Sequence, residues 1–155
     1  MKKNILSAAL ILILLVPAFA KQKKIPPSVN LTDADVIAFA EHCVDIMDDI
    51  EDAGVEEVND ECTKAEKEAV EKILEKYGIS GPNRYDKLES IILSYSKCKL
   101  EKEMKDSSWF LQLTMAKKIK KLFDEKINPD DEAVVAKHLK LLDEKFGPIL
   151  EEGDY

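Results

Sequence analysis

The chain contains 155 residues, of which 31 are Asp or Glu and 23 are Lys or Arg. This length suits one small domain, the 45% share of hydrophobic residues excludes a disordered chain, and only 5 Gly and 6 Pro exclude a fibrous or low-complexity one. The acidic balance disfavours nucleic acid and anionic lipid surfaces as partners, because both carry negative charge.

The first twenty residues have the pattern of a secretory signal peptide. Lys2 and Lys3 supply a short basic region, residues 5–16 are almost continuously aliphatic, and residues 18–20 (Ala-Phe-Ala) have the form of a cleavage site. The apolar run is shorter than the roughly twenty residues needed to cross a bilayer. We therefore expect residues 1–20 to be removed and the mature chain to be exported to a bacterial periplasm or the cell exterior, without stable membrane insertion.

Composition then divides the mature chain. Residues 21–30 include Pro26 and Pro27 and have no apolar period, which predicts a flexible or extended lead-in. A single all-helical domain is expected over residues 31–150, followed by an acidic tail over residues 151–155.

The domain begins with two predicted amphipathic helices. The first starts at Thr32, which has the spacing of a capping box with Asp35, and its apolar residues recur every three or four positions until Gly54. The second is predicted from about residue 55 or 59 to residue 77, where Gly78 supplies a left-handed stop.

Three further helices are predicted, over residues 83–105, 106–127 and 128–146. The last has clear boundary signals, since Asn128 caps it, a proline occupies its first position, and Gly147 followed by Pro148 is typical of a helix end. Short connections favour antiparallel neighbours, so the expected fold is an all-α bundle of about five helices.

The three cysteines predict one disulfide, because an exported chain folds in an oxidising compartment. Cys62 and Cys98 lie about equally far from the turn near residue 80, so an antiparallel hairpin would bring them to one level. This pairing is favoured, although pairings of Cys43 with either of them remain open. Cys43 is then expected to be a buried free thiol.

Charge is segregated along the chain. Residues 25–63 contain twelve acidic residues and no Lys or Arg, whereas residues 97–126 contain nine lysines against five acids. Four aspartates are spaced by three and four residues and should form one ridge of the first helix: Asp45, Asp48, Asp49 and Asp52. Either the basic region lies near the acidic block or solvates its own helices, or the ridge binds a cationic partner or a divalent ion.

The fourth predicted helix is apolar nearly all round in its first two turns. Its side chains belong either to the core or to a pocket for a small apolar ligand such as a fatty acid. The residues that would line this pocket are Tyr95, Trp109, Phe110, Leu113, Met115 and Phe123.

Motifs of known catalytic and metal sites are missing from the sequence. There is no Gly-rich phosphate loop, no Gly-x-Ser-x-Gly and no His-Glu-x-x-His, and the two histidines, His42 and His138, lack a zinc-binding spacing. An EF-hand register that starts at Asp49 fails at its fifth, eighth and twelfth positions. We therefore expect no catalytic residue, metal or cofactor. The favoured function is a non-catalytic protein-interaction module, and the alternative is a carrier of a small apolar ligand.

Overall fold

The computed structural model describes residues 25–55, 58, 61–105 and 120–152. Within these ranges every regular element is a helix, as the apolar periodicity predicts. The predicted signal peptide and most of the predicted helix over residues 106–127 lie outside the described residues, although residues 120–126 are helical.

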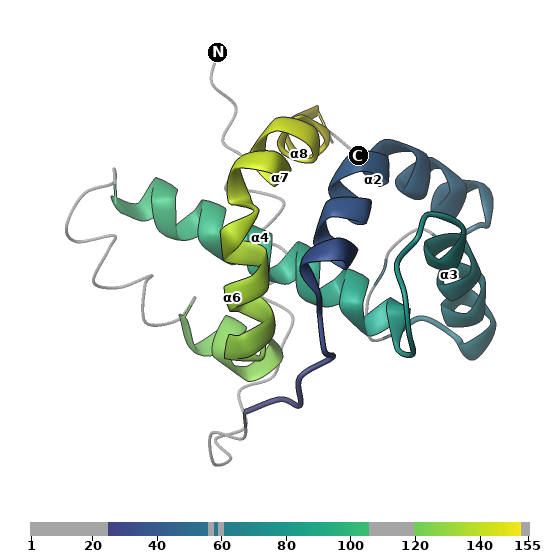
Figure 1. Cartoon of the computed structure of the whole chain (residues 1–155), viewed down its shortest axis with the longest axis horizontal. Helices are drawn as coiled ribbons and strands as arrows, with labels where there is room; N and C mark the ends of the chain where they lie inside the picture. Colours follow the sequence, from purple (N-terminus) through teal and green to yellow (C-terminus); the bar gives the residue numbers. More distant parts are fainter. Residues whose placement is uncertain (1–24, 56–57, 59–60, 106–119, 153–155) are drawn as a thin grey trace.

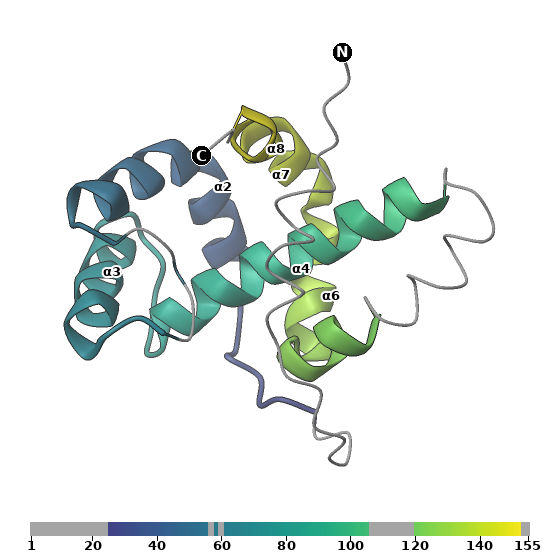
Figure 2. The ribbon, with the colours of Figure 1, turned by 180° about the vertical axis from the view of Figure 1, so that it is seen from behind.

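Six helices have both ends in the described part of the chain. They are α2 (Asp33–Asp52), α3 (Lys64–Lys76), α4 (Arg84–Lys105), α6 (Pro129–Lys137), α7 (Leu139–Lys145) and α8 (Gly147–Glu152). The longest, α4, spans the molecule; α2 and α3 are grouped around its N-terminal half, and α6 and α7 cross its middle (Figure 1, and from behind in Figure 2).

The boundaries of α2 follow local sequence signals. The Thr32 side chain accepts a hydrogen bond from the Asp35 backbone N–H, and the Asp35 side chain accepts one from the Thr32 backbone, which completes the predicted capping box. At the other end Gly54 adopts a φ of +79°, which lets the Val55 N–H donate back to the Ile50 carbonyl. Both predicted ends of this helix are confirmed.

The start of α3 differs from the prediction. The helix begins after Thr63, which forms a second capping box with Glu66, rather than near residue 55 or 59. Its end is as predicted, because Gly78 takes a φ of +87° and stops the helix after the cap residue Tyr77. The late start leaves Cys62 outside the helix.

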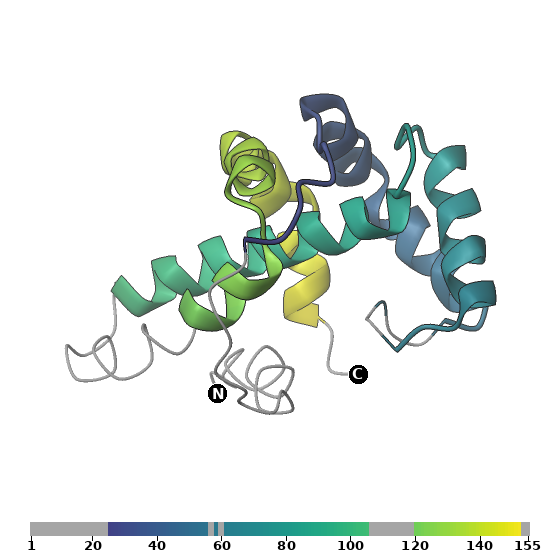
Figure 3. The same ribbon diagram turned by 90° about the horizontal axis from the view of Figure 1, so that it is seen from below.

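α3 lies at a steep angle to α4 and not alongside it (Figures 1 and 3). Ion pairs join the first residue of α4 to α3, with the Arg84 guanidinium 3.1 Å from Glu75 and 3.6 Å from Glu71. The hairpin geometry on which the predicted disulfide depends is therefore not the arrangement of these two helices.

The predicted final helix, over residues 128–146, is divided into two. It breaks at His138, which caps α6 and precedes α7, and the chain forms α8 from Gly147 onward. The prediction that Gly147 is a left-handed stop is wrong: proline is compatible with a first helical turn, so Pro148 helps to begin α8. Glycine is needed at residue 147 for space, since a Cβ there would lie 3.1 Å from the Tyr95 hydroxyl oxygen.

Three aromatic rings from separate elements form the centre of the main core. Phe39 of α2 and Tyr95 of α4 both pack on Phe146, at ring-centroid distances of 5.0 Å and 5.6 Å. A second, smaller cluster contains Leu100, Phe123 and Ile127. Burial of these side chains is the main driving force that fixes α2 and α7 on α4.

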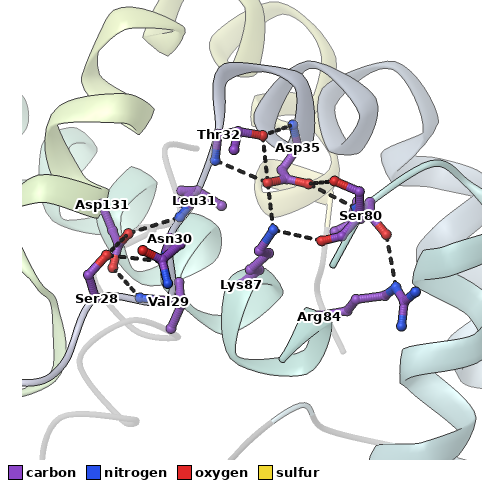
Figure 4. A network of polar contacts seen from close by, with 11 residues as sticks. Ser28, Val29, Asn30, Leu31, Thr32, Asp35, Ser80, Arg84, Lys87 and Asp131 are labelled. Atoms are coloured by element: carbon purple, nitrogen blue, oxygen red, sulfur yellow. Dashed lines mark hydrogen bonds and ion pairs between the residues drawn. The ribbon is translucent and has the colours of Figure 1, made fainter. Parts of the chain in front are cut away.

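The segment before α2, residues 26–31, lies against the start of α6 and is called the N-terminal strap below. The buried Asp131 carboxylate accepts hydrogen bonds from the Ser28 hydroxyl and from the Val29 and Leu31 backbone N–H groups, at 2.9 to 3.1 Å (Figure 4). Asn128 adds a hydrogen bond to the Pro26 carbonyl. These hydrogen bonds hold the segment that leads into α2 against the start of α6.

Candidate functional site

The candidate site is the outward face of α2. One side of this helix is buried, and its inward residues include Val36, Phe39 and Ile46. Asp45, Asp48 and Asp52 lie on the opposite side and are exposed, and the Asp45 side chain is 67% exposed. We call these three residues the acidic face of α2.

Exposed neighbours extend this surface along the helix. Val44 is 54% exposed, which makes it one of three exposed large hydrophobic side chains among the described residues. Glu41 and Glu51 are also exposed. The surface therefore combines carboxylates with an uncovered aliphatic side chain, which is a composition suited to contact with a cationic, partly apolar partner.

Asp49, the fourth member of the predicted ridge, has a different role. Its Oδ2 accepts hydrogen bonds from the Lys76 ammonium at 2.8 Å and from the Tyr77 hydroxyl at 2.9 Å, and its side chain is 33% exposed. The bond from Lys76 and then that from Tyr77 lower the pKa of Asp49 below its usual range. Asp49 therefore fastens α2 to the end of α3.

Two further carboxylates of α2 are engaged inside the molecule. Asp35 is fully buried and accepts hydrogen bonds from Lys87, Thr32 and Ser80 (Figure 4). Burial raises the pKa of Asp35, but these hydrogen bonds outweigh burial and lower it overall. Asp33 lies 2.9 Å from the His138 ring and 3.6 Å from the Lys137 ammonium.

The cations that compensate α2 thus come from α3, α4 and α6, at Lys76, Lys87 and Lys137. Lysines from the basic region pair with other carboxylates: Lys97 with Glu132 and Asp124, Lys99 and Lys102 with Asp143, and Lys126 with Glu89. The ion pairs of the basic region therefore stabilise α4 against α6, α7 and residues 120–126.

The residues of the predicted apolar pocket are only partly described. Trp109, Phe110, Leu113 and Met115 lie outside the described residues. Tyr95 is fully buried in the main core and its hydroxyl donates to Asp143 at 2.9 Å, whereas Phe123 belongs to the second cluster.

No disulfide joins Cys43, Cys62 and Cys98 in the structure, so the favoured Cys62–Cys98 pairing is not seen. Cys62 packs against the main core just before α3. Cys98 lies half-buried on α4, where burial and then Glu132 of α6 raise the pKa of its thiol. The preference for this pairing assumed that both residues lie on facing, antiparallel helices, whereas Cys62 precedes α3 and α3 lies at a steep angle to α4 (Figure 3).

Cys43 is buried and forms no disulfide in the structure. Its Sγ donates to the carbonyls of Ala40 and Lys145, both at 3.4 Å, and burial raises the pKa of the thiol. A thiol with a raised pKa is less nucleophilic at neutral pH, since the thiolate is the reactive form. Cys43 therefore serves as a small core residue between α2 and the end of α7.

Asp131 is the polar residue whose role sequence reasoning missed. Its position near a helix start suggests a solvated charge that complements the helix dipole, but it is only 2% exposed and binds the N-terminal strap. No local pattern signals this contact, because the strap lies about one hundred residues earlier in the chain.

In the described ranges, no group of three or more His, Cys, Asp or Glu side chains is placed to hold a metal ion. None of the helices described combines the length and the apolar character needed to cross a membrane. Comparison of the chain with protein-family models, with curated proteins and with solved structures finds no match.

Proposed function

We propose that the protein is an exported, non-catalytic interaction module of the bacterial periplasm or cell exterior, which binds a cationic protein partner through the acidic face of α2. The observation that carries this proposal is the difference between the carboxylates of one helix. Asp33, Asp35 and Asp49 are matched by cations of the same chain, whereas Asp45, Asp48 and Asp52 point to solvent.

Electrostatics explains why such a face favours recognition. Like charges three and four residues apart on a helix repel one another and destabilise it modestly. A cationic partner relieves this repulsion and is attracted over a distance of about 8–10 Å at physiological salt. The partner proposed is therefore a protein surface rich in Lys or Arg, with an apolar residue that contacts Val44.

The test compares two variants with the same change in net charge. The first carries Asp45→Asn, Asp48→Asn and Asp52→Asn, and leaves Asp49 in place because it binds α3. The matched control neutralises three exposed carboxylates on other elements: Glu101→Gln, Glu125→Gln and Glu144→Gln.

Partners are cross-linked in the exported fraction of the native cell, and each variant is compared with the unaltered protein by quantitative mass spectrometry. A partner that is lost with the α2 variant and kept with the control supports the proposal. Equal recovery with both variants contradicts it.

The alternative, a carrier of a small apolar ligand, is favoured by one sequence observation, the nearly continuous apolar surface predicted for residues 109–115. Native mass spectrometry of the protein purified from the exported fraction tests it directly. Extra non-protein mass that organic solvent removes supports the carrier, and a bare chain that also fails to bind added fatty acid contradicts it.

A further inference from the structure

Both histidines of the chain lie near aspartates of α2, and one of them joins distant elements. His42 is 4.0 Å from Asp45 on the same helix, at an exposed site. His138 is only 20% exposed, and its Nε2 lies 2.9 Å from Oδ1 of Asp33 in the first turn of α2, 105 residues away in sequence.

His138 also marks the point at which α6 ends and α7 begins. Its backbone leaves the helical conformation, with φ −109° and ψ 13°, and its N–H donates to the Val135 carbonyl. The contact with Asp33 therefore holds the junction of two helices against the start of a third.

The chemistry of the two side chains makes this contact depend on pH. A carboxylate only accepts hydrogen bonds, so a neutral His138 must carry its proton on Nε2 to bind Asp33. A second proton on Nδ1 leaves that hydrogen bond in place and makes its donor a cation, so the attraction between opposite charges is added to a bond whose acceptor is already charged.

The other charged groups near the junction leave Asp33 as the partner of His138. Lys137 of α6 lies 3.6 Å from the same Asp33 oxygen. Asp143, the carboxylate of α7 nearest to this junction in sequence, faces α4 and binds Tyr95 and Lys99. Asp33 is thus the carboxylate that His138 contacts.

We propose that His138 and Asp33 form an acid-strengthened latch, which fastens the start of α2 to the α6–α7 junction more tightly when the imidazole is protonated. The hydrogen bond from His138, together with smaller contributions from Lys137, lowers the pKa of Asp33. The carboxylate therefore stays charged while the pH falls through the range in which imidazoles gain a proton.

The test is a double-mutant cycle at two pH values, made with the full chain purified from the exported fraction of the expressing cell. His138→Gln and Asp33→Asn both retain hydrogen-bonding groups but cannot titrate, and each site is partly exposed, so the variants should fold. All four proteins carry His42→Gln, which removes the other histidine. The coupling between residues 33 and 138 is measured by urea denaturation at about pH 5.5 and at about pH 8.

The coupling is expected to be about two- to five-fold larger, as a factor in the folding equilibrium constant, at the lower pH, which is the range for a partly exposed ion pair. A coupling that is equal at both pH values, or absent at both, overturns the latch. With His138→Gln in place, Lys137→Gln is the control variant: its effect on stability should then be the same at both pH values, since no histidine remains to change its charge between them. Because this readout is folding stability, it is independent of whether the proposed partner of α2 exists.

Discussion

Asp35 of α2 and Lys87 of α4 form a buried ion pair, with 2.8 Å between Nζ and Oδ2 and side chains that are 0% and 5% exposed. Lys87 also donates to the Ser80 carbonyl at 2.7 Å, and the Asp35 carboxylate accepts from Thr32 and from Ser80. Each charge therefore has several partners, and the pair joins the start of α2 to the turn between α3 and α4.

Replacing Lys87 by methionine should destabilise the fold by about 3–5 kcal/mol, because the change leaves the Asp35 charge buried without its cation. Urea denaturation at neutral pH measures the free energy of unfolding. Lys72→Met is the matched control, since Lys72 is exposed on α3, and it should change stability by less than about 0.5 kcal/mol. Equal losses in the free energy of unfolding for the two substitutions would contradict a stabilising role for the buried pair.

Stability should fall as the pH drops below about 4. Hydrogen bonds and nearby cations lower the pKa values of five carboxyl groups in the folded chain: Asp33, Asp35, Asp49, Glu66 and Asp143. A lowered folded-state pKa means that the unfolded chain binds more protons, so the stabilisation is complete above the unfolded pKa and is lost through the folded one.

The measurement is the urea midpoint between about pH 7 and about pH 2, where the unfolded carboxyl pKa values near about 4 set the onset of the decline. Asp49→Asn should make the decline shallower, because it removes one of the five groups. A midpoint that stays constant down to about pH 3 would contradict this account.

Gly147→Ala should destabilise the protein by about 1–3 kcal/mol, the usual effect of overpacking, because the new Cβ meets the Tyr95 hydroxyl oxygen at 3.1 Å. In a Tyr95→Phe background, which removes that oxygen, the same substitution should have a clearly smaller effect. Gly78→Ala is the comparison. An added Cβ at residue 78 meets open space, and the substitution is unfavourable only because the backbone φ there is +87°. Tyr95→Phe should therefore not change its effect.

Thiol counting tests the cysteine arrangement. Protein purified from the exported fraction without reductant, then unfolded and alkylated, should show three modified cysteines per chain, because no disulfide joins Cys43, Cys62 and Cys98 in the structure. Mass spectrometry distinguishes this result from the single modified cysteine that an internal disulfide would leave. The folded protein should react more slowly at Cys43 than at Cys62, since Cys43 is buried.

Local signals account for what the sequence predicted well. The capping box at Thr32 and the left-handed glycines at residues 54 and 78 depend on neighbours within a few positions, so they can be read without a tertiary structure. The second capping box, at Thr63 and Glu66, has the same pattern and could have placed the start of α3 correctly.

The errors arose where contacts distant in sequence decide the local structure. Gly147 is typical of a helix end, yet the approach of Tyr95 from α4 determines its role. The predicted disulfide assumed that α3 and α4 are antiparallel, and the steep angle between them depends on packing that no single segment encodes (Figure 3).

In the candidate site, too, local spacing predicts part of the arrangement and tertiary contacts decide the rest. Helical spacing predicts that Asp45, Asp48, Asp49 and Asp52 share one side of α2. Spacing cannot distinguish Asp49 from the others, because its hydrogen-bond partners, Lys76 and Tyr77, belong to the end of α3. Tertiary contacts therefore reduce a predicted ridge of four carboxylates to an exposed face of three.

The N-terminal strap implies an order of events during synthesis. Leu31 leaves the ribosome 100 residues before Asp131, the side chain that holds its backbone N–H. At about 5–20 residues per second, the strap waits roughly 5–20 s for the residue that completes its hydrogen bonds. The first segment of the domain to be made is therefore among the last to reach its native contacts, and a chaperone or export factor that binds it in that interval does not compete with the finished fold.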